Sequence, residues 1–199
     1  MTLGEALGLS DSQERHITRG LQLVLGGVIV AGVVTTQVGM AVTGSIALGV
    51  TLFPALLRRE YGYSMDPGLV LWIAIAMILH TIGSLGIYEQ YQWYDEVTHT
   101  VSATIIAGIG YASFRALERH YDALDVPSEF RAVFIVVFVL ATGVFWEVIE
   151  YVLGGYVTVY GIDDIVTDFV FNAVGAVIVA VWGTGYVRNL TGFFSDRLR

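Results

Sequence analysis

Two pairs of ionisable residues carry most of the chemistry that this sequence could perform. Asp95 and His99 are four residues apart, and so are Asp164 and Asp168. On an α-helix, residues i and i+4 lie one above the other on the same face, so the two side chains of each pair would point in one direction. Helical bundles use this spacing to aim carboxylates and imidazoles at a shared metal ion. The two pairs therefore predict a metal site between helices.

Further ionisable residues lie within apolar stretches of the sequence. A charged group at membrane depth is costly unless it is paired, hydrated or bound to metal, so it is a functional candidate by default. The candidate metal ligands are His80, Asp95, His99, Glu147, Glu150, Asp164 and Asp168. Histidines and carboxylates without sulfur suit Zn²⁺, Mn²⁺ or Fe²⁺, in a site for one or two ions. The candidate catalytic residues are Glu150, as general base, and Asp95, which would orient His99 or bind the metal directly.

Simpler structural roles stay open for several of these residues. His80 could be a hydrogen-bonded core histidine, and Asp95 with His99 could form a helix cap and an interhelical hydrogen bond. Asp164 could be only the N-cap of the last helix. Asn172, in the same helix, favours a packing hydrogen bond over a ligand role.

The elements that must position these residues are six apolar segments. Hydrophobic residues make up 55% of the 199-residue chain, charged residues only 14%, and the mean hydropathy is +0.69, whereas soluble domains are about one quarter charged. Each segment approaches the ~20 residues that a helix needs to cross a bilayer. We place them at Ile17–Thr36, Met40–Leu57, Gly68–Tyr88, Asp95–Leu117, Glu129–Leu153 and Asp164–Val187. The sequence therefore predicts an all-α integral membrane protein, a bundle of six transmembrane helices.

The distribution of arginine predicts the orientation in the membrane. All ten basic residues are arginines, and with six spans they all fall on one side: Arg15, Arg19, Arg58, Arg59, Arg115, Arg119, Arg131, Arg188, Arg197 and Arg199. Because cytoplasmic loops carry the excess of basic residues, we expect both termini in the cytoplasm and the protein in the plasma membrane. All candidate ligands then lie in the outer-leaflet half of the bundle, each within a few turns of the outer end of its helix.

The chain is predicted to form a single membrane domain, residues 1–199, in three parts. Residues 1–16 would be a cytoplasmic N-terminal segment, residues 17–62 two scaffold helices, and residues 68–187 four helices that carry the polar site. The scaffold helices are rich in Gly and Ala, which lets helices approach closely. Aromatic residues near the outer helix ends, Tyr88 among them, are expected to anchor the helices at the membrane interface.

Composition excludes several classes of function. The sequence has no cysteine, so disulfides, thiolate metal sites and cysteine nucleophiles are excluded. The net charge is −8 and no basic patch is visible, so we expect no nucleic-acid partner. The expected partners are membrane lipids and a lipid or lipid-linked substrate, while the oligomeric state is left open.

The ordered set of motifs resembles the YjdF-like family of multispanning inner-membrane proteins. The motifs are Tyr94-Asp95 with His99, Trp146-Glu147-Val148-Ile149-Glu150-Tyr151, and Asp164 with Asp168 leading to Gly175-Ala176. His80 corresponds to an upstream histidine of the family, and Ile165 stands where the family pattern has threonine. The resemblance extends from about Met77 to Ala180. It implies a multispanning fold with a polar site and no particular activity, because the family is a domain of unknown function.

Three classes of function are compatible with these features, and whether the protein is an enzyme stays open. The first is a metal-dependent hydrolase or other intramembrane enzyme, including an oxidative di-iron one, that acts on a lipid or lipid-linked substrate. The second is a transporter of divalent cations or protons, although a conduit needs polar groups at successive depths and residues 108–114, 134–140 and 177–181 offer almost none. The third is a structural or assembly protein whose polar layer fixes helix packing.

Overall fold

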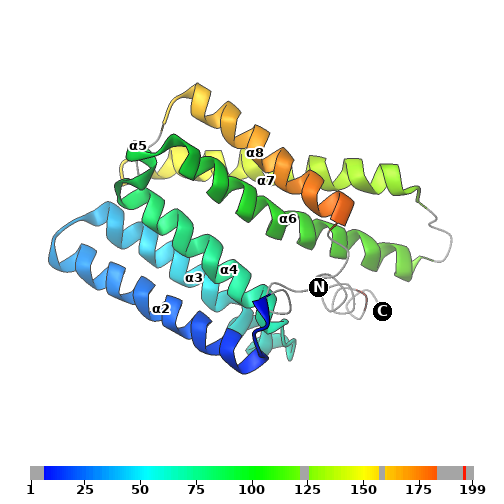
Figure 1. The fold of residues 1–199 in the computed structure, drawn as a ribbon, viewed down its shortest axis with the longest axis horizontal. Helices are drawn as coiled ribbons and strands as arrows, with labels where there is room; N and C mark the ends of the chain where they lie inside the picture. The colour runs from blue at the N-terminus through cyan, green and yellow to red at the C-terminus, as the bar shows by residue number, and fades with distance from the viewer. Residues whose placement is uncertain (1–6, 122–125, 157–159, 183–194, 196–199) are drawn as a thin grey trace. The chain divides into compact units, whose positions relative to one another are not determined.

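The structure is a computed structural model that describes residues 7–121, 126–156, 160–182 and 195, and within these residues all regular structure is helical. The elements, labelled as in Figure 1, are α2 (Asp11–Val34), α3 (Val38–Tyr61), α4 (Pro67–Ile82), the π-helical turn η1 (Gly83–Ile87), α5 (Tyr88–Gln90), α6 (Gln92–His120), α7 (Ser128–Leu153) and α8 (Ile162–Trp182).

Six helical segments are long and apolar enough to cross a membrane, which confirms the predicted fold class and number of spans. They are Asp11–Val34, Val38–Tyr61, Pro67–Gln90, Gln92–Glu118, Ser128–Leu153 and Ile162–Val181. The orientation of the termini and the plasma-membrane location stay predictions. The predicted end of the last span, residues 183–187, lies outside the described residues.

The first long helix begins earlier than the sequence indicated, at Asp11 rather than Ile17. The reason is a capping box: the Ser10 hydroxyl accepts a hydrogen bond from the Gln13 backbone N–H, and the Gln13 side chain accepts one from the Ser10 backbone N–H. This pairing satisfies two backbone donors that a helix N-terminus otherwise leaves without partners. Residues 11–16 are therefore the first turns of α2.

The chain divides into two compact units, and the predicted single domain stays a prediction. The first unit comprises Met1–Thr98 and Val148–Gly161, and the second comprises His99–Glu147 and Ile162–Arg199. In the first unit α2, α3 and α4 pack against one another. A Cβ at Gly32 would lie 2.6 Å from the backbone nitrogen of Ala41, so α2 and α3 approach closely where α2 has no side chain.

Proline lies inside one of these scaffold helices. Pro54 of α3 is buried and has no backbone N–H to continue the helical hydrogen bonds. In the preceding turn, the carbonyl oxygen of Thr51 accepts a hydrogen bond of 3.1 Å from the side-chain amide of Gln22 on α2. A polar side chain of one scaffold helix thus bonds to the backbone of the other beside the proline.

In the second unit α6, α7 and α8 run alongside one another (Figure 1) and share an apolar core. The core consists of Ala103, Ala107, Ile135, Val139, Ala176 and Val179. A Cβ at Gly175 would lie 2.6 Å from both the Thr100 carbonyl oxygen and the Ala103 Cβ atom, so α8 contacts the backbone of α6 directly. This close packing fixes which side chains of α6 and α8 can meet.

A polar cluster also joins α6 to α7, near the end of α6. Glu118 is buried, with 7% of its side chain exposed, and it accepts hydrogen bonds from Arg115 on its own helix and from Arg131 of α7. The bond from Arg131 is 2.7 Å long. Bonds between a guanidinium and a carboxylate are among the stronger hydrogen bonds in proteins, so this cluster clamps the two helices together.

Candidate functional site

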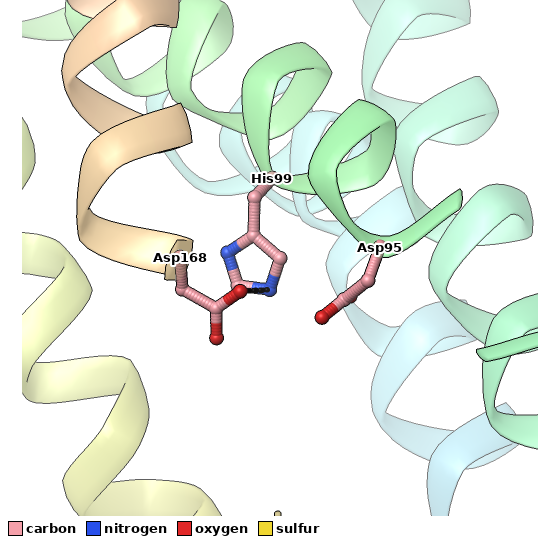
Figure 2. Close-up of side chains that lie close together, drawn as sticks. All are labelled: Asp95, His99 and Asp168. Carbon is pink, nitrogen blue, oxygen red and sulfur yellow. Dashed lines mark ion pairs between the residues drawn. The ribbon is translucent and has the colours of Figure 1, made fainter. Parts of the chain in front are cut away.

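The centre of the candidate site is an imidazole and a carboxylate that face each other from two helices of the second unit. His99 Nε2 of α6 lies 3.5 Å from Asp168 Oδ1 of α8, as Figure 2 shows. The two side chains are only 9% and 4% exposed. The contact of α8 with α6 at Gly175 holds the two helices close enough for this pair to form.

Asp95 precedes His99 by one turn of α6, and this continuous helix sets the spacing between the two residues. Asp95, His99 and Asp168 each offer one ligand atom, and these atoms lie within 4.8 Å of one another (Figure 2). This agrees with two features of the sequence interpretation, the i,i+4 pairing of Asp95 with His99 and the participation of Asp168.

The spacing of the central pair is compatible with a shared ion. Two ligands of a tetrahedral zinc, each about 2.1 Å from the metal, are separated by about 3.4 Å. The 3.5 Å between His99 Nε2 and Asp168 Oδ1 is close to that separation. One imidazole and two carboxylates also form a donor set that suits Zn²⁺, Mn²⁺ or Fe²⁺, and two carboxylates balance the charge of a divalent ion. The residues present therefore fit such a metal.

Asn172 supports His99 from α8. It lies one turn after Asp168, is buried, and makes a side-chain hydrogen bond to His99. Gly143 of α7 provides the space, since a Cβ there would lie 2.9 Å from Asn172 Nδ2. The packing hydrogen bond expected from the sequence therefore has the candidate ligand as its partner, and it limits how the imidazole can rotate.

A second set of polar contacts, within the first unit, leads to Asp95. The Tyr88 hydroxyl lies 2.8 Å from His80 Nδ1 and 3.2 Å from Thr98 Oγ1. Thr98 in turn donates a hydrogen bond to the Asp95 backbone carbonyl oxygen, at 2.8 Å, and lies 3.3 Å from the Asp95 carboxylate. His80, Tyr88, Thr98 and Asp95 form what we call the Tyr88 chain.

The other predicted ligands are half-buried on helices α4, α7 and α8. Among the residues that the structure describes, the group of ligand atoms around His99 includes none from His80, Glu147, Glu150 or Asp164. Their roles as ligands, and the role of Glu150 as general base, stay predictions.

Two members of the Tyr88 chain were missed by the sequence interpretation. Tyr88 was expected to anchor the helix at the interface, and Thr98 was not singled out. The signal that could have found Tyr88 is the pair Gly83 and Gly86, which interrupts an apolar helix just before it.

The fold and the site define a multi-pass helical membrane protein with an Asp–His–Asp cluster. The chain belongs to the predicted membrane protein family DUF2238, whose family model matches residues 17–189. This agrees with the resemblance to YjdF-like proteins. An uncharacterized protein of Thermotoga maritima is 23% identical over 179 residues, which cover 86% of this chain and 91% of that protein. No solved structure matches the chain.

Proposed function

We propose that Asp95, His99 and Asp168 bind a divalent metal ion and that the protein is a metal-dependent hydrolase of a lipid or lipid-linked substrate. The observation that carries this proposal is the convergence of three ligand atoms within 4.8 Å, two of them from residues that are almost fully buried. Carboxylates gathered at this distance repel each other unless they take up protons or share a cation. A divalent ion offsets both the repulsion and the cost of burying the charges.

Bound in this cluster, a divalent metal would lower the pKa of a water ligand and polarise a phosphoryl or acyl oxygen. Three protein ligands leave a coordination position for that water, as in known catalytic zinc sites. Asn172 would hold the imidazole of His99 in place through its side-chain hydrogen bond. Glu150, half-buried near the end of α7, is the proposed general base.

The surroundings favour a substrate that is itself dissolved in the membrane. The cluster lies in helical segments that are apolar enough to span a bilayer, one to two turns from the start of α6 and α8. Exposed apolar residues lie close in sequence to the site on α7 and α8: Phe145 two residues before Glu147, and Val166 and Val170 two residues either side of Asp168. A lipid or lipid-linked molecule could reach this level without leaving the bilayer.

The apolar core favours a closed site over a path for ions. Further along α6 than His99, and further along α8 than Asn172, the buried core residues include Ala103, Ala107, Ala176 and Val179. A conduit for cations or protons needs polar groups at successive depths. The core of the second unit offers apolar side chains instead, so hydrolysis is preferred to transport.

The first test is the metal content of the detergent-purified full-length protein. We expect stoichiometric Zn, Mn or Fe in the wild type, and loss of that metal in His99→Ala and in Asp168→Asn. The matched controls are His16→Ala and Asp163→Asn, which change an exposed histidine and an exposed aspartate of the same helix as Asp168. Glu147→Gln would show whether this glutamate is an additional ligand.

A folded wild type that holds no metal, even after incubation with each of the three ions, would refute the metal proposal. If metal is bound, the hydrolase proposal is tested with lipids that carry carboxylic ester or phosphoester bonds. Product should form with the wild type and Asp163→Asn but not with Asp168→Asn. Absence of product from both bond types would leave a metal-binding membrane protein and exclude the hydrolase.

A further inference from the structure

Tyr88 lies at the centre of a hydrogen-bond chain whose direction follows from counting protons. The Thr98 hydroxyl has one proton, which points to Asp95 and is shared between its backbone carbonyl oxygen at 2.8 Å and its carboxylate at 3.3 Å. Thr98 must therefore accept the 3.2 Å bond from Tyr88, which uses the only proton of the tyrosine hydroxyl. The Tyr88 oxygen then accepts a hydrogen bond from the Nδ1–H group of His80, 2.8 Å away. In the Tyr88 chain every hydrogen bond is therefore donated in the same direction, from the imidazole of His80 towards Asp95.

The backbone is interrupted where Tyr88 has to turn back towards His80. In an unbroken helix, residues 80 and 88 would be roughly 12 Å apart along the axis. Here η1 interrupts the helix, and Gly86 has a φ of 114°, a left-handed conformation that favours glycine. The rings of His80 and Tyr88 consequently lie with their centroids 6.5 Å apart.

A second glycine makes room for the tyrosine ring. A side chain at Gly83 would overlap the ring atoms of Tyr88, so only glycine leaves the ring its place. Interruptions of this π-helical kind within α-helices occur frequently at functional sites. The break costs regular helical hydrogen bonds within an apolar segment, and what it places is a tyrosine hydroxyl between two polar side chains.

The Tyr88 chain of hydrogen bonds ends at a residue of the candidate metal site. Thr98 is fully buried, so its hydroxyl is confined to the partners that the protein provides. One of them is the carboxylate of Asp95, the first residue of the Asp95, His99 and Asp168 group. Groups that hydrogen-bond to a metal ligand fix its orientation, and their loss weakens metal binding by about 10- to 100-fold.

We infer that Tyr88 is a positioning residue for the metal site, which holds Asp95 in its binding orientation through Thr98 and is itself held by His80. This inference rests on the proposed function, because it needs the cluster to bind a metal. It assigns His80 a role in supporting a metal ligand instead of binding the metal. It also explains why the helix is interrupted at Gly83 and Gly86.

The test uses Co²⁺ as a probe, bound to the detergent-purified full-length protein and followed by its visible absorption. Tyr88→Phe keeps the ring and removes the hydroxyl, and Thr98→Val keeps the shape of the side chain and removes its hydroxyl. Both should weaken Co²⁺ binding by about tenfold and alter the absorption bands, because Asp95 loses its fixed orientation. Thr98→Ser, which keeps the hydroxyl, should restore affinity and spectrum.

Tyr94→Phe is the matched control. The Tyr94 hydroxyl also joins α6 to α4, with a 3.2 Å hydrogen bond to the Leu79 carbonyl oxygen, but it has no part in the Tyr88 chain. We expect its Co²⁺ affinity and spectrum to equal those of the wild type. The comparison separates loss of the chain from loss of a tyrosine hydrogen bond between these two helices.

Any other outcome contradicts either the positioning role of Tyr88 or the metal site itself. Wild-type affinity and spectrum in Tyr88→Phe and Thr98→Val would overturn the positioning role and leave the metal site standing. Equal losses in Tyr88→Phe and Tyr94→Phe, or no recovery in Thr98→Ser, would also overturn it, since helix packing would then explain the effect. A folded wild type that binds no Co²⁺ would overturn both this inference and the metal site.

Discussion

The two polar clusters carried by α6 differ in how their charge is balanced. Glu118, near the end of the helix, is bound by two arginines, one of them at 2.7 Å. His99, near its beginning, faces Asp168 at 3.5 Å, with Asp95 one turn away. The Glu118 cluster brings its own cations, whereas the His99 cluster combines two acids with a single imidazole. A buried cluster with its own counterions needs nothing further, while one with excess acid favours an added cation.

The strongest test of this difference is to remove one acid from each cluster and measure the stability of each variant without metal. Glu118→Ala should lower the free energy of unfolding by about 3 kcal/mol, because it leaves two arginines without their buried carboxylate. Asp168→Asn should lower it little, because it removes a carboxylate from a group with excess acid. SDS titration in mixed micelles gives both values. Equal losses would mean that both clusters serve packing alone.

Added metal should stabilise the protein only where the His99 cluster is intact. At a free metal concentration 100 times the Kd, the wild type should be stabilised by about 2.7 kcal/mol, because only the folded state offers the assembled site. Glu118→Ala should gain as much as the wild type, and Asp168→Asn should gain nothing. Thermal unfolding in detergent, with and without the metal, would show this. An equal gain in all three proteins would place metal binding elsewhere in the chain.

The smallest effect is expected from glycines of α6 and α8 between the two clusters. Gly175→Ala should destabilise the protein by about 2 kcal/mol, because the new methyl group meets the Thr100 carbonyl oxygen and the Ala103 Cβ at 2.6 Å. It should also weaken metal binding by moving α8 away from α6. Gly108→Ala, with nothing within 4 Å of its added Cβ, should instead stabilise α6 by up to about 1 kcal/mol. Unfolding and metal titrations of the two variants side by side would test this.

Much of the fold could be predicted because hydropathy alone marks segments that must cross a membrane. The start of α2 could not, because its first turns are polar and only the pairing of Ser10 with Gln13 shows that they are helical. The break at η1 was also missed, since the run from Gly68 to Tyr88 is mostly apolar and hydropathy does not report backbone conformation. Gly86, at a φ of 114°, has no hydropathic signature.

The candidate site, like the fold, could be predicted only in part. The four-residue spacing of Asp95 and His99 predicted that they would share a face, because the helix alone determines it. That Asp168 comes to lie beside His99 depends on how α8 packs against α6, which spacing cannot supply. Tyr88 and Thr98 were overlooked because hydroxyl groups are common in membrane helices and reveal a role only through their partners.

The hydrogen bond from Gln22 to the Thr51 carbonyl has a consequence for how the protein enters the membrane. An amide side chain is unfavourable in lipid when it lacks a partner, and the Thr51 carbonyl oxygen of α3 provides one for Gln22 of α2. The helix α2 is therefore not at its lowest energy in the bilayer without α3. We expect the two helices to leave the insertion machinery as one hairpin, which would give the helices made later a finished surface on which to assemble.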